Sequence, residues 1–349
     1  MINLAVVGLG HWGPNLARNI AALPNARLHT LCDVQPQRLE KLARLHTGVK
    51  LQQDYEAVLA DSEVDGVIIA TPVSTHFELA SAALKAGKHV LVEKPLADNS
   101  EHCRELIALS EKAGLTLMVG HVFLFNAAVR KVKEYLEAGE LGEVYYIYSQ
   151  RLNLGIIRQD VNALWNFAPH DLSILYYWLG MPAERVVARG YSYVQPDIED
   201  AVFMTLDFPG GVGANVHISW LDPHKVRRMT IVGSEKMVVY DDVSLEGRVV
   251  LYDKGVARSV QGNAPLGSYE SFGEFQLLVR AGDVLVPKLD FAEPLKLQCE
   301  HFTRCIETGE LPLTDGRHGL QIVEALEAAQ SAMDQARANA VPIGGGGTE

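Results

Sequence analysis

The sequence predicts an α/β fold in two parts, a doubly wound parallel sheet followed by an α+β domain with a large, mostly antiparallel open sheet. Three observations support this fold class. The chain has 349 residues, which is more than one hydrophobic core usually holds. Short β-branched runs alternate with longer amphipathic segments from residue 2 to about residue 120, as parallel strands with crossover helices require. Beyond residue 121, strand-like segments separated by glycine and proline turns dominate.

The first part contains the elements of a parallel sheet in order. We expect strands over residues 3–7, 27–32, 66–70, 89–92 and 115–119, with helices near 13–22, 36–45, 74–86 and 100–113 between them. Gly48, Gly87 and Gly114 follow three of these helices, and glycine is favoured there because it adopts the left-handed backbone conformation. This order of elements predicts a domain over residues 1–121.

The second part begins with a helix near 126–138 and a strand over 144–152. Further strands are expected over residues 185–193, 201–208, 213–220, 227–232 and 237–240, interrupted by one helix over 170–179 that Gly180 and Pro182 end. Helices near 293–307 and 317–336 close the chain, and they are candidates to pack back on the first domain. We therefore predict a second domain over residues 122–338 and a flexible tail over 339–349, where four glycines stand in a row.

Composition excludes several classes of protein. A formal charge of −12 disfavours nucleic acid and anionic membranes as partners, because both require a basic face. No apolar run reaches the length of a membrane span, and no leader peptide precedes the first strand, which predicts a cytoplasmic protein. Four cysteines lack the spacing of a disulfide scaffold and are expected to be buried apolar residues. We also find no HxxxH, CxxC or clustered His/Asp spacing, and so expect no metal.

A glycine-rich turn follows the first predicted strand and opens the first helix. It reads Gly8-Leu9-Gly10-His11-Trp12-Gly13, a GxGxxG pattern whose amides and helix dipole suit a pyrophosphate. Asp33 lies twenty residues after Gly13, at the end of the second strand, where a carboxylate binds the ribose hydroxyls of a dinucleotide. A carboxylate there repels the 2′-phosphate of NADP, so NAD is the expected cofactor, although nearby Arg38 partly offsets that repulsion.

Two further segments stand at the carboxyl ends of predicted parallel strands, the edge where open α/β sheets bind ligands. They are Thr71-Pro72 and Glu93-Lys94-Pro95. The ammonium of Lys94 suits a substrate hydroxyl whose oxygen becomes anionic as hydride leaves the adjacent carbon. In the second part, His170 is expected in the first turn of its helix, where an imidazole is suited to general base catalysis. The alternative is a histidine packed under that helix, with Asp171 as a first-turn charge.

These motifs, in this order and spacing, resemble the glucose-fructose oxidoreductase, inositol dehydrogenase and rhizopine catabolism (Gfo/Idh/MocA) family of NAD(P)-dependent oxidoreductases, which act on CH–OH groups. The resemblance covers nearly the whole chain and rests on the glycine turn, Asp33 with Arg38, Thr71-Pro72 with His76, Glu93-Lys94-Pro95, and His170-Asp171. It implies a Rossmann domain joined to an α+β domain whose open sheet forms the interface of a homodimer or homotetramer. It also implies a cis Lys94–Pro95 peptide, contact of Lys94 with both nicotinamide ribose and substrate, and proton transfer by Lys94 and His170.

The chain departs from the family pattern at two places. Many members have an aspartate four residues before the histidine, where this chain has Asn166, so an inositol-dehydrogenase type of site is disfavoured. After the fifth strand the chain carries apolar residues where many sugar-binding members have an arginine. His121 in this stretch either contacts nicotinamide or substrate, or is satisfied by backbone groups.

The substrate is expected to be a sugar. Arg151, Asn153 and Arg158 provide guanidinium and amide donors, with Trp165 and Asn166 nearby in the sequence, and arginine suits phosphate. This combination resembles the nucleotide-sugar 3-dehydrogenases, which oxidise C3 of a UDP-N-acetylglucosamine-type sugar. The arginines are alternatively surface or interface residues. Other hypotheses are an inositol or free-sugar dehydrogenase, a keto-sugar reductase, and a non-catalytic protein that senses NAD and sugar.

Overall fold

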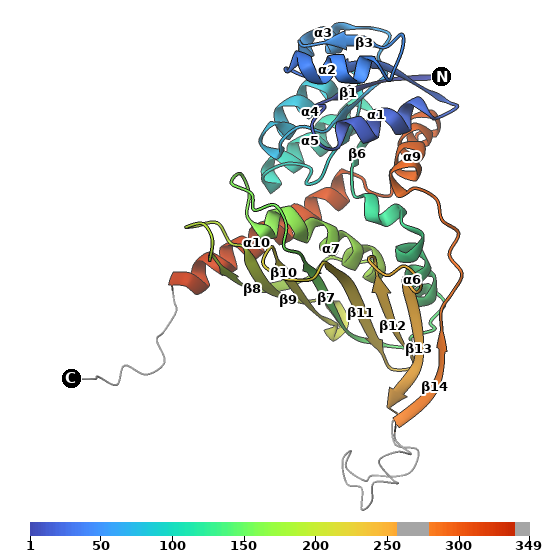
Figure 1. Ribbon diagram of the computed structural model, residues 1–349, viewed down its shortest axis with the longest axis vertical. Coiled ribbons are helices and arrows are strands. Elements are labelled where there is room, and N and C mark those ends of the chain that lie inside the picture. The colour runs from blue at the N-terminus through green and yellow to red at the C-terminus, as the bar shows by residue number, and fades with distance from the viewer. Residues whose placement is uncertain (257–278, 339–349) are drawn as a thin grey trace, which may run out of the picture. The chain divides into compact units, whose positions relative to one another are not determined.

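The computed structural model describes residues 1–256 and 279–338, so the predicted tail lies outside the described residues. The chain divides into two compact units (Figure 1). Unit 1 contains Met1–Asn126 and Phe291–Glu327, and unit 2 contains Ala127–Asp290 and Ala328–Glu349. Most residues of the two closing helices, Pro294–Thr308 and Gly316–Ala338, therefore belong to the first unit. The domain boundary between residues 121 and 122 stays a prediction.

The sheet of unit 1 has six strands in the order β3-β2-β1-β4-β5-β6, and all five neighbouring pairs are parallel. The strands are β1 (Ile2–Val7), β2 (Ala26–Cys32), β3 (Lys50–Gln52), β4 (Gly66–Ile69), β5 (His89–Val92) and β6 (Leu117–Val119). The strand order reverses between β1 and β4, and a sheet of this kind binds ligands beyond the carboxyl ends at that reversal. The predicted doubly wound sheet is confirmed.

The helices of unit 1 cover the sheet, and the sequence shows why they begin and end where they do. Asn99 caps one of them by accepting a hydrogen bond from the backbone of His102 at 2.8 Å, and Gly114 ends it with a positive φ of 65°. The elements are α1 (Gly13–Ala21), α2 (Pro36–Ala43), α3 (Tyr55–Ala60), η1 (Val73–Thr75), α4 (His76–Lys85), α5 (Ser100–Ala113), η2 (Val122–Phe125), α9 (Pro294–Thr308) and the start of α10 (Gly316–Ala338).

The sheet of unit 2 has eight strands in the order β14-β13-β12-β11-β7-β10-β9-β8. Six of its seven neighbouring pairs are antiparallel, and one pair, β7 with β10, is parallel. This confirms the mostly antiparallel sheet. The strands are β7 (Val144–Leu152), β8 (Arg185–Tyr191), β9 (Ala201–Asp207), β10 (Gly213–Ser219), β11 (Val226–Gly233), β12 (Met237–Asp241), β13 (Val249–Val256) and β14 (Val279–Leu285).

Two helices of unit 2, α6 (Ala127–Glu137) and α7 (Ala163–Leu179), pack on one face of this sheet (Figure 1). A short η3 (Pro209–Gly211) forms the turn between β9 and β10. The prediction that the second helix starts at residue 170 is wrong, because Asn162 caps it by accepting a hydrogen bond from the backbone of Trp165 at 3.1 Å. Pro169 lies inside the helix, so His170 lies near its middle rather than in its first turn.

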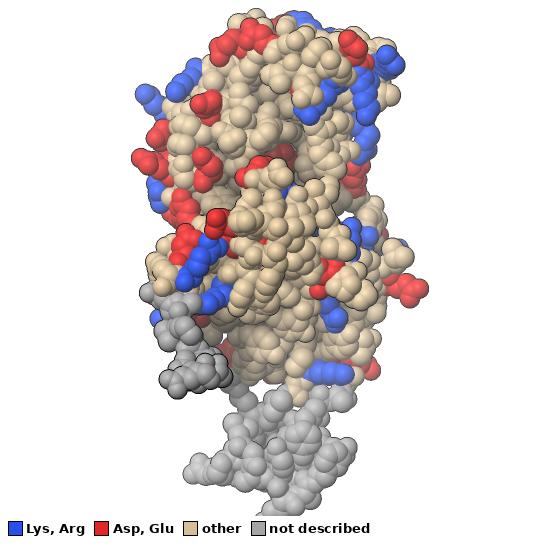
Figure 2. Space-filling model, turned by 60° about the vertical axis from the view of Figure 1, so that its left-hand side comes forward, with Lys and Arg blue, Asp and Glu red and all other residues tan. Residues whose placement is uncertain are grey.

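The surface carries charges of both signs. Figure 2 shows basic and acidic side chains intermingled over the face that it draws. Among the residues that the structure describes, no helix combines the length and the apolarity that a membrane span requires. All four cysteines are buried and unpaired, as expected.

Candidate functional site

The glycine turn of unit 1 has the backbone geometry of a phosphate-binding loop. Gly8 has a φ of +88°, and a Cβ on Gly13 would lie 2.0 Å from the carbonyl oxygen of Gly8, so only glycine fits at both positions. A Cβ on Gly10, by contrast, would meet a single heavy atom within 4 Å, Nη1 of Arg38 at 3.9 Å. The backbone at Gly10 is therefore accessible to a ligand, as a pyrophosphate requires.

Asp33 connects the second strand to this turn. Its Oδ2 accepts a hydrogen bond from the backbone N–H of Leu9 at 2.7 Å, and its Oδ1 accepts one from Gln35 at 2.8 Å. The side chain is buried, and Nη1 of Arg38 lies 3.3 Å from Oδ2. The carboxylate expected to bind ribose thus also fixes the turn. In the same turn, His11 is exposed and the indole of Trp12 is 40% exposed, and the first turn of α1 contains no acidic residue that would repel a phosphate.

His76 joins the two strand-end segments that the sequence indicated. Its Nδ1 lies 2.8 Å from the carbonyl oxygen of Pro95, and its Nε2 lies 3.0 Å from that of Thr71, next to Pro72. Burial lowers the pKa of His76, so the neutral ring donates to one of these carbonyls at a time. His76 was predicted as a cofactor contact, and these contacts support a positioning role, because the ring connects the backbone after β4 to the backbone next to Lys94.

The peptide between Lys94 and Pro95 is cis, as the resemblance implied. Lys94 is the second residue after the carboxyl end of β5, and its backbone N–H lies 3.4 Å from Oε2 of Glu93. Burial raises the pKa of Glu93 to about 7. Its carboxylate lies over Gly120, where a Cβ would be 3.1 Å from the carboxylate atoms. A glycine at the end of β6 therefore leaves room for an acid beside the lysine.

His121 lies in the same region with a second histidine that the sequence did not indicate. The His121 ring is buried, and neither of its nitrogens has a hydrogen-bond partner among the described residues. His318, near the start of α10, contacts it edge to face at 5.3 Å between ring centroids. Burial lowers the pKa of His121 well below its usual value and that of His318 to about 4, so both rings are neutral. The two residues are too far apart in the chain for a spacing pattern to connect them.

The candidate residues of unit 2 lie on α7 and on the strands beneath it. Asn166 and His170 are one helical turn apart and therefore share a face, and both are half-buried, as is Trp165. The indole N–H of Trp220 lies 3.4 Å from Oδ1 of Asn166. Trp220 was missed as a site residue because it follows a strand far along the chain and belongs to no recognisable motif.

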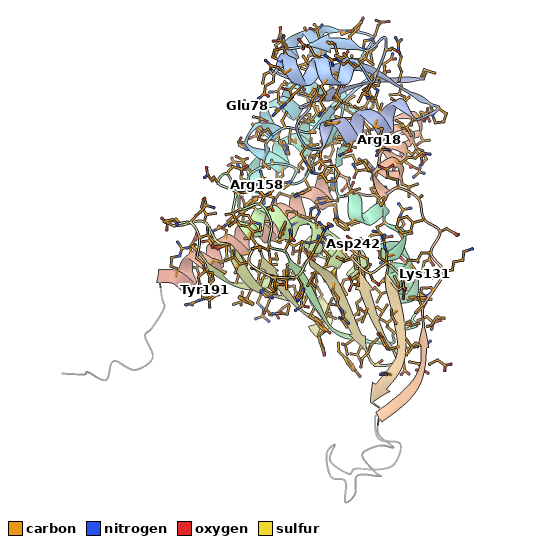
Figure 3. All side chains as sticks on the ribbon, in the orientation of Figure 1. Arg18, Glu78, Lys131, Arg158, Tyr191 and Asp242 are labelled. Carbon is orange, nitrogen blue, oxygen red and sulfur yellow. The ribbon has the colours of Figure 1, made fainter. Side chains whose placement is uncertain are left out.

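The arginines expected to bind substrate differ in their surroundings. Arg151 is 4% exposed and forms a buried ion pair with Asp171, so its guanidinium supports α7. Arg158, labelled in Figure 3, is 40% exposed and donates to Asp160 through Nε at 2.8 Å. Asn153 is half-buried, and its backbone N–H donates to Ser219 at 3.1 Å. Arg158 is thus more accessible than Arg151.

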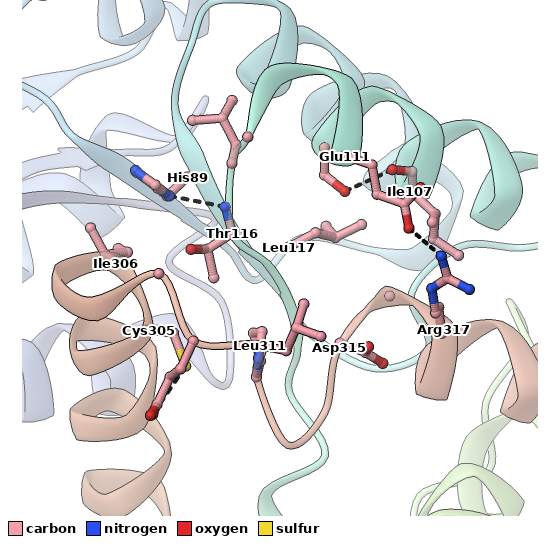
Figure 4. A pocket seen from close by; sticks show the side chains of 17 residues that line it. His89, Ile107, Glu111, Thr116, Leu117, Cys305, Ile306, Leu311, Asp315 and Arg317 are labelled. Atoms are coloured by element: carbon pink, nitrogen blue, oxygen red, sulfur yellow. Dashed lines mark hydrogen bonds and ion pairs between the residues drawn. The ribbon is translucent and has the colours of Figure 1, made fainter.

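Unit 1 also contains a cavity of about 310 Å³ away from the glycine turn (Figure 4). His89 and Thr116, at the amino ends of β5 and β6, line it, so it lies at the opposite edge of the sheet from Lys94. Arg317 and Glu111 form an ion pair in its wall, with 2.6 Å between Nη2 and Oε1. This position does not suit a dinucleotide bound at the glycine turn.

Among the described residues there are two groups that each bring three potential metal ligands together, although no ligand spacing was recognised in the sequence. They are His301, Cys305 and Glu310, and His29, Asp61 and Glu63. In both groups a basic side chain of the protein lies beside the potential ligand atoms, where a metal ion would have to bind. Arg304 donates to Glu310 and lies 2.6 Å from Nδ1 of His301. Lys50 lies within 3.0 Å of both carboxylates of the second group.

A glycine turn at the start of a doubly wound sheet, a carboxylate at the end of β2 and a lysine at the end of β5 together define a dinucleotide-binding oxidoreductase. Comparison with known proteins identifies the family. Residues 2–121 match the model described as an oxidoreductase family with an NAD-binding Rossmann fold, and residues 129–239 match the GFO/IDH/MocA C-terminal domain. The chain belongs to the Gfo/Idh/MocA family of oxidoreductases, and NAD as its cofactor is confirmed.

Several relatives are enzymes that act on sugars or polyols. The UDP-N-acetylglucosamine 3-dehydrogenase of Acidithiobacillus ferrooxidans is 30% identical, over 72% of this chain and 76% of the relative. Its solved structure matches with a TM-score of 0.79 and 26% identity, over 96% of this chain and 98% of that chain. The scyllo-inositol 2-dehydrogenase of Bacillus subtilis is 26% identical, over 89% of this chain and 88% of the relative. The expected class, an NAD(P)-dependent oxidoreductase acting on CH–OH groups, is confirmed.

Proposed function

We propose that this enzyme oxidises the C3 hydroxyl of a UDP-N-acetylglucosamine-type nucleotide sugar to the 3-keto sugar. The observation that carries the proposal is the 30% identity to a UDP-N-acetylglucosamine 3-dehydrogenase over about three quarters of both chains. Arg158 supports it, because an accessible guanidinium suits the diphosphate of such a substrate. Asn153 and Trp165 are the further substrate contacts that we propose, and Asn166 orients a hydroxyl.

Two residues perform the proton chemistry in this proposal. The ammonium of Lys94 donates a hydrogen bond to the C3 oxygen and stabilises the negative charge that develops there. The hydroxyl proton passes to the His170 imidazole while hydride leaves C3; in the alternative, Lys94 enters the reaction as a neutral amine, takes the proton itself and becomes the ammonium. NAD, when bound, accepts that hydride. Lys94 and His170 belong to different units, and their joint action stays a prediction.

The residues expected around the cofactor have the following roles in this proposal. The backbone of Gly8 to Gly13 holds the pyrophosphate, and Asp33 with Arg38 faces the adenosine ribose. Thr71, Pro72 and Glu93 border the nicotinamide, with His76 fixing the backbone of this edge. His121 completes the nicotinamide pocket, because buried ring nitrogens require a hydrogen-bond partner and a bound ligand or water would provide it.

Oxidation of an inositol is the second candidate, favoured by the similarity to scyllo-inositol 2-dehydrogenase over most of both chains. The neutral amide of Asn166 weighs against it, because an amide neither accepts a proton nor balances a charge at neutral pH. The two candidates differ in what Arg158 does, since a free polyol has no phosphate for it to bind.

The test is to incubate the enzyme with NAD and UDP-N-acetylglucosamine, with its uronate, or with scyllo- or myo-inositol. Formation of NADH or of a 3-keto sugar with either nucleotide sugar supports the proposal. A keto-acid acceptor is included, so that an enzyme that retains its cofactor still turns over. Turnover of inositol alone would establish the second candidate, and absence of both signals with the nucleotide sugars would reject the first.

We also propose that the enzyme is a homodimer or homotetramer that forms through the outer face of the unit 2 sheet. Large apolar and aromatic side chains point away from the helices along neighbouring strands, and exposed patches of this kind mark interfaces. The members of this outer-face patch are Tyr146, Tyr148, Val187, Tyr191 and Phe203, each 37% exposed or more. Tyr191 is labelled in Figure 3. A cytoplasmic location is proposed as well, on the basis of the NAD cofactor and the four unpaired cysteines.

A further inference from the structure

A buried polar network connects the central strand of the unit 2 sheet to helix α7. Asp171 is 1% exposed, and its Oδ1 accepts a hydrogen bond from the hydroxyl of Ser149 at 2.6 Å. Its Oδ2 accepts a hydrogen bond from Nε of Arg151. Ser149 and Arg151 are two residues apart on β7, so both point to the face on which α7 packs. Asp171 is the residue immediately after His170.

A buried polar network of this kind contributes more to the orientation of the helix on the sheet than to the stability of the fold. Leu172, Ile174 and Leu175, which are close to Asp171 on the helix, are apolar and fully buried, and apolar contacts are not directional. Replacing a buried ion pair by apolar residues is often neutral for stability, so its contribution is better sought in conformational specificity. The two oxygens of the Asp171 carboxylate bind two side chains of one strand, and this restricts the rotation of α7 about its axis.

The helix needs such a contact close to His170, because Pro169 weakens it there. Proline has no N–H, so the carbonyl of Trp165 lacks its usual partner within the helix. The other fixed point is at the start of the helix, about two turns before the proline. Asn162, at the start of α7, donates to Glu199 at 2.7 Å and to Gln330 at 2.8 Å. The proline lies between these two fixed points.

We propose that Asp171, held by Arg151 and Ser149, is a positioning residue that sets the rotation of α7 and thereby the place of the His170 imidazole. The proposal rests on the role of His170 in the proposed function. It gives Arg151 a place in the reaction different from the substrate contact expected from the sequence, since the guanidinium acts through the helix.

The decisive variant is the double substitution Arg151→Met and Asp171→Leu, which replaces the pair by apolar side chains of similar length. Its first readout does not depend on the substrate. The ring signals of His170 are followed by NMR in protein with labelled histidine and assigned by comparison with His170→Gln. The second readout is kcat for whichever sugar the wild-type enzyme oxidises, with the dissociation constant for NAD and the Tm measured alongside.

We expect the His170 signal to shift or broaden in the double variant and kcat to fall about 10- to 100-fold, because small misplacements of a catalytic group have effects of this size. NAD binding and the Tm should stay close to the wild-type values. The matched control removes an exposed Arg–Asp pair of the same sheet, Arg185→Gln with Asp207→Asn, whose atoms lie 3.5 Å apart. This control should leave the His170 signal and kcat unchanged.

An unchanged His170 signal and kcat in the folded double variant would overturn the proposal. If the double variant does not fold, Ser149→Ala decides, since it removes only one hydrogen bond of the network. A shifted His170 signal with a several-fold lower kcat then supports the proposal, and wild-type behaviour overturns it. If the wild-type enzyme oxidises neither nucleotide sugar, the proposed substrate fails, while the NMR comparison still tests the positioning role.

Discussion

Asp33 holds the backbone of Leu9, with 2.7 Å between the carboxylate oxygen and the amide nitrogen. This hydrogen bond fixes the glycine turn, and we predict that the same carboxylate repels the 2′-phosphate of NADP, so the two roles can be separated by substitution. Asp33→Ala removes both functions. We expect it to lower the free energy of unfolding by about 1–3 kcal/mol, because a buried donor loses its partner, and to reduce the preference for NAD over NADP.

Asp33→Asn separates the two functions, because the amide oxygen still accepts from Leu9 while the charge is gone. It should lower the preference for NAD, measured as the ratio of kcat/KM for the two cofactors, with a smaller loss of stability than Asp33→Ala. A ratio that stays at the wild-type value in both variants would contradict the assignment of Asp33 to cofactor selection.

Lys94→Ala is expected to abolish most turnover with only a small loss of affinity for NAD, because Lys94 is one of many expected cofactor contacts. The lysine is assigned to the substrate oxygen, and removing one electrostatic stabiliser of a transition state lowers kcat about 100- to 1000-fold. Isothermal titration of NAD and steady-state kinetics check the two parts of this expectation. Turnover at the wild-type rate in Lys94→Ala would contradict its catalytic role, and Lys85→Ala, at the end of α4, is the control.

The stability of the enzyme should fall on acidification, in a window set by His318. Burial lowers its pKa to about 4, whereas the unfolded chain takes up a proton near the ordinary value of 6.5. The unfolded state therefore binds more protons between these values, and stability present above pH 6.5 is lost as the pH falls toward 4. His318→Phe should reduce the decrease in Tm across this window by a few degrees. His224→Gln, at an exposed position, should leave the decrease as it is.

Charges placed in the outer-face patch should dissociate the enzyme. Phe203 stacks on His217 at 4.3 Å between ring centroids, and Tyr148 is on β7, the next strand beyond β10. The double variant Tyr148→Arg and Phe203→Asp should sediment as a monomer where the wild-type protein sediments as a dimer or tetramer. A wild-type monomer at micromolar concentration, or a variant of unchanged size, would disprove assembly through this face.

Local patterns sufficed to predict much of unit 1. The glycine turn, the acid after β2 and the lysine after β5 are specified within segments of a few residues, and parallel topology brings strand ends together without further information. Two elements of unit 1 that were missed, β3 and α3, contain three and six residues, which is too short for a periodic pattern.

Unit 2 was harder to predict because its contacts join distant segments. Arg151 has the residue type of a phosphate ligand, and its burial follows only from Asp171, a residue of a different element. The start of α7 was misplaced because a proline inside a helix is rare and the capping residue, Asn162, stands well before it. His318 and Trp220 likewise acquire a neighbour only in the folded chain.

The parallel pairing of β7 with β10 has a consequence for biosynthesis. The two neighbours of β7, β10 and β11, begin at Gly213 and Val226, so the central strand leaves the ribosome long before either of them. During this interval both of its hydrogen-bonding edges are open, which exposes a nascent chain to mispairing. We expect the sheet to complete late in translation, only after β14, which ends at Leu285, has been made.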